Sequence, residues 1–364
     1  MTTELDPGEL IAQLPYALGF YPTTETVVIV SDTDRRRLWD FPPDRPAVDV
    51  ATTLAAACDD DPQLRVTPVV YAGRVDFAVE IDATDLATAL SAHFPAVDAP
   101  VVATPDGWRH AVDCPGRCCT DGQSLNPATL PADLAHAAIT TWPTPMATRT
   151  DLADYFTPDP IHRTLVAAAR TTAARQQRAA ILNAGGPAAW RRGATEQAWA
   201  HLTSVRALSP ATAARTLLQL QDTYVADALL MRIQHSPSEG GSADRALTAL
   251  RELCRSAPDD LAPAALSTWA HAAASRGDIP RAMAAISRTQ QLTPRHHPTS
   301  VLQRLLIDGV DPADLAAVQL PEDSLLNTAE PISPAVVSGA GPPGPPPQPP
   351  PSAGPPPPTP GRTR

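Results

Sequence analysis

The chain contains no lysine, and all 28 of its basic residues are arginine. This absence excludes three classes of enzyme, because a P-loop nucleotide site, a pyridoxal-phosphate enzyme and a protein kinase each need a lysine for their chemistry. Aromatic residues are also scarce, at 4% of the 364 residues. Because hydrophobic residues still make up 43% of the chain, we expect a sizeable core built mainly from Ala, Leu and Val.

The sequence also lacks the features of export and of membrane insertion. The segment Met1–Gln13 carries Glu4, Asp6 and Glu9 but no positively charged side chain, which a secretory signal requires. No apolar run is long enough to span a bilayer. An odd number of cysteines in a long chain without a signal is typical of reduced thiols, so we predict a cytoplasmic protein. The five cysteines are Cys58, Cys114, Cys118, Cys119 and Cys254.

Acidic residues outnumber basic ones, and the formal net charge is −11. Such a chain repels nucleic acid and anionic membranes at long range, so neither is an expected partner. The sequence contains no Gly-x-Ser-x-Gly, His-Glu-x-x-His or Gly-x-Gly-x-x-Gly motif. Whether the protein is an enzyme therefore stays open, and we predict no cofactor apart from the zinc ion considered below.

Residues 1–145 mix strand-like and helix-like segments, which predicts an α/β domain with a mixed sheet. The β-branched run at 26–31 is typical of a buried strand. The turn at 105–107 (Pro-Asp-Gly) predicts a hairpin, and Asp82 is the expected N-cap of a helix that ends near His93. Further strands are expected at 38–41 and 65–71, and another helix at 47–58.

The pattern becomes helical at residue 148, and we predict an all-helical domain over residues 148–320. Three helix starts carry a capping residue followed by proline, at Asp159, Ser209 and Asp311. The pattern favours seven or eight helices with short connections. Small residues at 269–274, a Gly-Asp turn and an Ala-rich helix that ends before Pro294 resemble a tetratricopeptide hairpin.

Residues 331–364 consist almost entirely of Pro, Gly, Ser and Ala. Such a segment buries too little apolar surface to offset the loss of chain entropy, so we predict a disordered tail with polyproline II character. The proline run at 345–351 fits the ligands of aromatic-lined domains, but its composition favours a spacer or a drifted low-complexity end.

Several segments resemble a known family. The run from Leu14 to Pro22, which continues into the strand at 27–30, is similar to the opening of the actinobacterial family called domain of unknown function 4192. The cysteines near Gly122 and the hairpin that ends at Pro294 resemble the same family, and the resemblance covers about residues 5–320. The sequence departs from the family's pattern at Tyr21, where histidine is common. The resemblance implies relatives and a source group but no activity.

A cysteine-rich loop is the first candidate site. His110, Cys114, Cys118 and Cys119 lie within ten residues, and zinc accepts both Cys and His as ligands. The spacing is unlike that of a zinc knuckle, because the segment has one Cys-x3-Cys and an adjacent third cysteine. The alternative is a loop that buries one or two thiols.

An arginine stripe on one helix is the second candidate. The stripe spans one face of the predicted helix that begins at Pro160, and its members are Arg163, Arg170, Arg175 and Arg178. It could bind phosphate, nucleic acid or an acidic partner. The alternative is a solvated face whose arginines pair with the chain's own excess of carboxylates.

The third candidate is the loop at 19–24, where Phe20 and Tyr21 precede the buried strand. The loop could line a cleft at the edge of the sheet, or it could be a turn that holds Phe20 in the core.

Taken together, these features favour a non-catalytic binding or adaptor module whose partner docks on the helical domain or on the proline-rich tail. One alternative is a hydrolase with a site at the sheet edge of the α/β domain. A second alternative is a nucleic-acid-associated protein that uses the stripe from Arg163 to Arg178.

Overall fold

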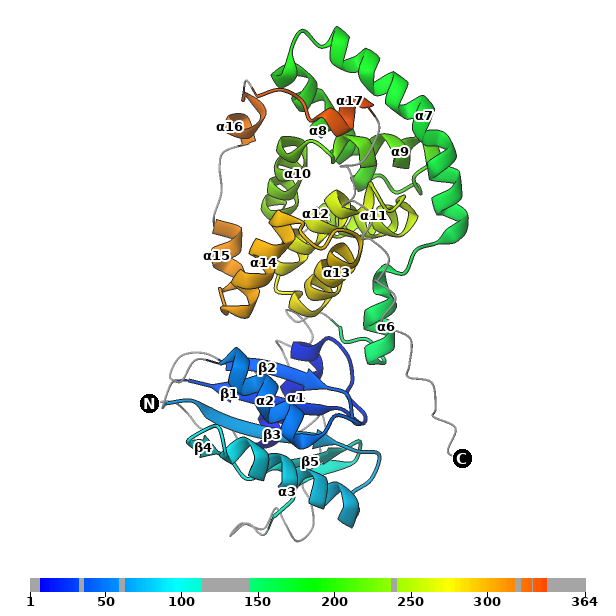
Figure 1. The fold of residues 1–364 in the computed structure, drawn as a ribbon. Coiled ribbons are helices and arrows are strands. Elements are labelled where there is room, and N and C mark those ends of the chain that lie inside the picture. Colours follow the sequence, from blue (N-terminus) through cyan, green and yellow to red (C-terminus); the bar gives the residue numbers. More distant parts are fainter. Residues whose placement is uncertain are drawn as a thin grey trace, which may run out of the picture.

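The computed structural model describes residues 7–32, 36–58, 63–112, 144–236, 241–317, 322–328 and 330–338. A mixed sheet with its helices forms the N-terminal part, and the remaining described residues form a helical domain (Figure 1). The predicted fold class is therefore confirmed.

The strands of the sheet are β1 (Thr26–Ser31), β2 (Arg36–Phe41), β3 (Arg65–Tyr71), β4 (Ala96–Val97), β5 (Val101–Thr104) and β6 (Gly107–His110). Their order is β2-β1-β3-β5-β6, with β4 also paired to β3. Strand β1 is antiparallel to both of its neighbours, and β3 is parallel to β5. Strands β5 and β6 pair as the hairpin that the Pro-Asp-Gly turn predicts.

Helices cover both faces of the sheet. Helix α1 (Pro7–Leu18) packs on the face that carries Val27 and Ile29, whereas α2 (Ala47–Ala57) and α3 (Phe77–Ser91) pack on the face that carries Val28 and Val30. A strand that is buried on both faces does not alternate apolar with polar residues, which explains the unbroken apolar run of β1.

Helix α3 begins earlier than predicted. Its N-cap is Asp76, whose carboxylate accepts hydrogen bonds from the backbone N–H groups of Ala78 and Val79 at 3.1 and 3.2 Å. The expected cap, Asp82, is an exposed residue inside the helix. Both aspartates are residues that cap helices well. Asp76 is the N-cap because a helix that starts there has more backbone hydrogen bonds than one that starts at Asp82.

The helical domain contains the expected short connections between helices. Asp159 and Ser209 cap their helices through side-chain hydrogen bonds, with proline in the first turn as predicted. The helices are α6 (Arg149–Ala153), α7 (Pro160–Asn183), α8 (Pro187–Thr203), α9 (Pro210–Gln219), α10 (Thr223–His235), α11 (Ser242–Ser256), α12 (Ala262–Ala274), α13 (Ile279–Leu292), α14 (His297–Ile307), α15 (Pro312–Ala317), α16 (Glu322–Leu326) and α17 (Pro334–Ser338). A 3₁₀ turn, η2 (Asp154–Phe156), follows α6.

Helix α12 is the centre of this domain, and nearly every one of its residues is buried. Its alanines allow close approach of α13, with which it forms a helical hairpin around Gly277 at φ +81°. The core of this domain therefore consists mainly of Ala and Leu side chains, as the low aromatic content predicts.

The C-terminal helices pack back onto the domain. Leu325, Leu326 and Val336 are buried, and α17 contacts α7 and α9. Residues 331–338, which begin the segment that composition assigns to the tail, therefore belong to the helical packing. Residues 339–364 lie outside the described residues, and so does the proline run at 345–351.

The segment that follows α1 joins the two parts of the molecule. Gly19 and Tyr21 exchange backbone hydrogen bonds with Met146, at 2.7 Å from Met146 N to Gly19 O and 3.0 Å from Tyr21 N to Met146 O. Gly19 has φ +79°, and a Cβ atom there would lie 2.3 Å from the Cβ of Pro280 on α13. Only glycine fits this position, because it satisfies the left-handed backbone and the close approach together.

Replacing Gly19 with alanine should therefore destabilise the protein. We expect Gly19→Ala to lower the free energy of unfolding by at least about 2 kcal/mol, through backbone strain and the clash with Pro280. Gly73→Ala is the control, because its added Cβ meets no atom within 4 Å, and it should stay within about 0.5 kcal/mol of wild type. Urea unfolding of both variants tests this, and equal stabilities would contradict it.

Candidate binding groove in the helical domain

The predicted loop site at the sheet edge is occupied by structural contacts. Phe20 is buried in the core on the α1 face of the sheet, as the second interpretation of this loop proposes, while Tyr21 is 48% exposed. Glu25, which sequence reasoning did not single out, is buried there. Its carboxylate accepts hydrogen bonds from the backbone N–H groups of Thr23 and Thr24 at 2.6 and 3.0 Å. The carboxylate thus closes the loop.

Burial, with a smaller contribution from the Glu25 charge, raises the pKa of Tyr71 far above its usual value. The phenol oxygen of Tyr71 has no hydrogen-bond partner among the described residues. A phenol that stays protonated beside a fully engaged carboxylate does not form an acid–base pair at neutral pH.

The structure describes only one member of the predicted zinc site. His110 ends β6 and packs edge-to-face against Trp108, with ring centroids 5.6 Å apart, and burial lowers its pKa. Cys114, Cys118 and Cys119 lie outside the described residues, so the zinc site stays a prediction. Within the described ranges, no group of three His, Cys, Asp or Glu side chains could hold a metal ion.

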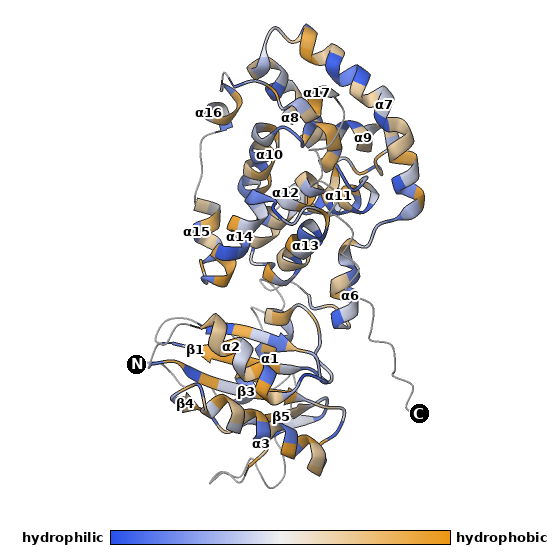
Figure 2. Ribbon diagram, viewed as in Figure 1, coloured by the Kyte–Doolittle hydropathy of each residue, from blue (hydrophilic) through white to orange (hydrophobic). Residues whose placement is uncertain are grey.

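Two members of the arginine stripe form ion pairs with carboxylates of the same chain. Arg163 lies 2.5 Å from Asp259, and Arg170 binds both carboxylate oxygens of Asp260 at 2.6 and 3.1 Å. Both aspartates precede α12. Hydrophilic and hydrophobic residues alternate along α7 (Figure 2), and Arg175 and Arg178 are exposed farther along it. The first half of the stripe thus holds α7 against the domain.

A buried ion pair lies at the centre of the domain. Arg191 on α8 and Asp222, the N-cap of α10, are 0% and 1% exposed, and their side chains share two hydrogen bonds of 3.0 and 3.2 Å. The guanidinium also donates to the carbonyl oxygens of Thr328 and Pro331 and lies 4.4 Å from the ring centre of Tyr224. It therefore ties α8, α10 and the C-terminal segment together. No sequence signal marks this pair.

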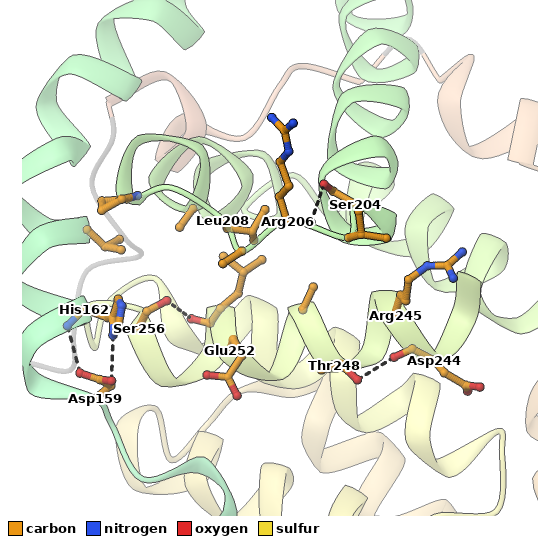
Figure 3. Close-up of a pocket in the computed structure, with 17 residues that line it drawn as sticks. Asp159, His162, Ser204, Arg206, Leu208, Asp244, Arg245, Thr248, Glu252 and Ser256 are labelled. Carbon is orange, nitrogen blue, oxygen red and sulfur yellow. Dashed lines mark hydrogen bonds and ion pairs between the residues drawn. The ribbon is translucent and has the colours of Figure 1, made fainter. Parts of the chain in front are cut away.

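The helical domain contains a groove with a volume of about 680 Å³. It lies between the start of α7, the segment 204–209 that links α8 to α9, and α11 (Figure 3). Ser204 and Ser209 shape the linking segment by accepting hydrogen bonds from backbone N–H groups. The floor of the groove is aliphatic and is formed by Val166, Leu208, Ala213, Ala249 and Leu253.

The charged residues at the groove are not balanced. Two of its carboxylates form ion pairs with arginines outside the groove: Asp244 lies 2.8 Å from Arg276, and Glu252 lies 3.2 Å from Arg251 and 3.5 Å from Arg255. Asp159 forms a hydrogen bond of 2.8 Å with Nδ1 of His162. Arg206 and Arg245 are exposed and form no ion pair with any residue that the structure describes. These two arginines are therefore available to an anionic partner.

The Asp159–His162 pair and the serines of the groove do not form a catalytic triad. The Nδ1 atom of His162 bonds to Asp159, whose carboxylate also caps α7, and the backbone and side-chain hydrogen bonds from His162 lower the pKa of Asp159. The hydroxyl of Ser256 donates to the carbonyl of Leu253 at 3.2 Å, and within the described residues no serine hydroxyl contacts the His162 ring. A nucleophile must lie within hydrogen-bond reach of its base, so this pair is a helix cap.

The fold is a small N-terminal mixed sheet followed by a larger helical region, which carries an open groove. The chain belongs to the family described as Domain of unknown function (DUF4192), whose profile matches residues 7–313. This match confirms the resemblance that begins at Leu14–Pro22, and it covers both parts. Searches of the curated proteins and of the solved structures gave no match. None of the described helices is both long enough and apolar enough to cross a membrane.

Removing Arg191 should be far more damaging than removing an arginine of the stripe. We expect Arg191→Met to lower the free energy of unfolding by about 3–5 kcal/mol, because it leaves the buried Asp222 carboxylate without its partner. Arg170→Met, a matched change at a partly exposed pair, should cost about 1 kcal/mol or less. Chemical denaturation checks both, and equal losses would contradict a central role for the buried pair.

Proposed function

We propose that this protein is a non-catalytic binding module and that the groove between α7, the 204–209 segment and α11 holds a segment of a partner polypeptide. The observation that carries the proposal is the groove itself. Its volume of about 680 Å³ and its aliphatic floor are typical of sites that bind ligands through apolar contact.

The margins of the groove support a polypeptide partner. Val205, which lines the groove on the linking segment, is 90% exposed. A large aliphatic side chain exposed at an apolar groove is typical of an interaction surface, because covering it removes apolar area from water. Grooves between helices accept amphipathic helices or extended segments in this way.

Two observations weigh against the alternatives. The loop at the sheet edge uses its carboxylate, Glu25, to bind its own backbone, so this carboxylate is not available as the acid or base of a hydrolase. Two of the four stripe arginines that a nucleic acid would need, Arg163 and Arg170, are paired with aspartates of the same chain. A non-catalytic binding module requires neither a catalytic acid or base at this loop nor unpaired arginines along α7.

Filling the groove should abolish peptide binding. Dodecapeptides selected by phage display on the full chain should lose at least about tenfold in affinity for Thr248→Trp, because the indole occupies the groove. Thr248 is exposed and its hydroxyl donates to the carbonyl of Asp244, so the substitution disturbs little else.

Thr88→Trp on α3 is the matched control, since Thr88 is also exposed and makes the same type of hydrogen bond, to Thr84. Fluorescence anisotropy of the selected peptides should show wild-type affinity for this variant. Peptides that bind the Thr248 variant as tightly as wild type would contradict the groove as the site.

A further inference from the structure

The groove's unpaired charges indicate which polypeptides it takes. On the basis of the function proposed above, we propose that the groove binds an acidic polypeptide segment, with aliphatic side chains on the floor and Asp or Glu carboxylates held by Arg206 and Arg245. The argument rests on charge complementarity. Two of the carboxylates that line the groove, Asp244 and Glu252, have arginine partners within the chain, whereas the two arginines that line it form no ion pair with any described residue.

The two arginines come from different elements that line the groove. Figure 3 shows Arg245 beside Asp244 and Arg206 between Leu208 and Ser204 with its guanidinium group directed away from α11, whereas Asp159 and His162 lie at the opposite end from Arg245. A bound segment would thus meet the two arginines with separate carboxylates and place its aliphatic side chains over the floor. Arginine suits this role, because its planar fork binds a carboxylate through two parallel hydrogen bonds.

The first turn of α11 adds to the preference for an anion. Arg245 lies in that turn, where the positive end of the helix dipole disfavours an unpaired cation. The N-cap, Gly241, offers no side-chain acceptor, and the acid in the same turn, Asp244, is held by Arg276. A carboxylate from a partner would therefore relieve an unfavourable arrangement as well as form a new ion pair.

The chemistry of the lining favours a polypeptide over a nucleic acid. The residues that line the groove include no Phe, Tyr or Trp side chain on which a base could stack, and the floor is aliphatic. The formal net charge of −11 also repels a polyanion at long range, whereas a short acidic segment carries too few charges for this effect to dominate. Two arginines thus attract one or two carboxylates within an otherwise acidic molecule.

The test uses fluorescein-labelled octapeptide pools with Leu fixed at positions 2 and 5. One pool carries Glu at positions 7 and 8, and the matched pools carry Gln or Lys there. Anisotropy on the full chain should show at least about tenfold tighter binding of the Glu pool, and this advantage should shrink as salt rises from about 50 to 300 mM.

The double variant Arg206→Gln, Arg245→Gln should bind the Glu pool only as tightly as wild type binds the Gln pool. Its control, Arg175→Gln with Arg304→Gln, removes the same charge from exposed positions outside the groove and should keep the wild-type preference.

The outcomes separate this inference from the function on which it rests. Equal binding of the Glu and Gln pools, both lost in Thr248→Trp, would overturn the acidic preference and leave the groove as a peptide site. Pools that bind Thr248→Trp as tightly as wild type would overturn the groove itself. A single-stranded oligothymidylate that displaces the Glu pool and depends on Arg206 and Arg245 would overturn the acidic polypeptide in favour of nucleic acid.

Discussion

The buried pair of Arg191 and Asp222 is the interaction on which the helical domain depends. Two opposite charges without access to water are tolerated only when every hydrogen-bonding group finds a partner. Here the partners come from α8, the start of α10 and the carbonyl oxygens of Thr328 and Pro331. Asp222 also follows the end of α9 closely, so the pair sets where α9 stops and α10 starts. The pair thus joins the start of α8 to the short connection between α9 and α10.

The aliphatic composition of the core has a consequence for the groove. Alanine-rich helices such as α12 pack closely, and many small aliphatic contacts surround the few buried aromatic residues of the core, such as Trp190 and Trp269. Exposed aliphatic side chains at the groove, such as Val205, are of the same residue types as those in the core. In the proposed function, a segment of another chain covers the aliphatic floor of the groove. The small sheet domain is fixed to this body through Gly19 and Met146.

Much of the fold could be predicted from local sequence. The β-branched run of β1, the Pro-Asp-Gly turn and the capped helix starts at Asp159 and Ser209 each act over a few residues, and all appear as predicted. The start of α3 was wrong because Asp76 and Asp82 carry equivalent local signals. The groove could not be predicted, because its residues come from segments spread between 159 and 256, and an aliphatic residue at helical spacing looks the same whether it faces the core or a groove.

The ion pairs could not be predicted from the sequence for the same reason. The arginine stripe was recognised, but its partners Asp259 and Asp260 lie about ninety residues away along the chain. Arg206 and Arg245 share no pattern in the sequence, and they become candidates only because the fold places both at the groove without an ion pair to any described residue. Composition gives the sum of the charges, and the fold decides which of them are paired.

The central claim is that partners bind at the helical groove, and hydrogen–deuterium exchange of the full chain tests it most directly. With the Glu-containing peptide pool present, the account predicts slower exchange in residues 204–213 and 244–256 and unchanged exchange across β1 to β6. Protection confined to the sheet domain around Phe20 and His110, with no change at the groove, would contradict it.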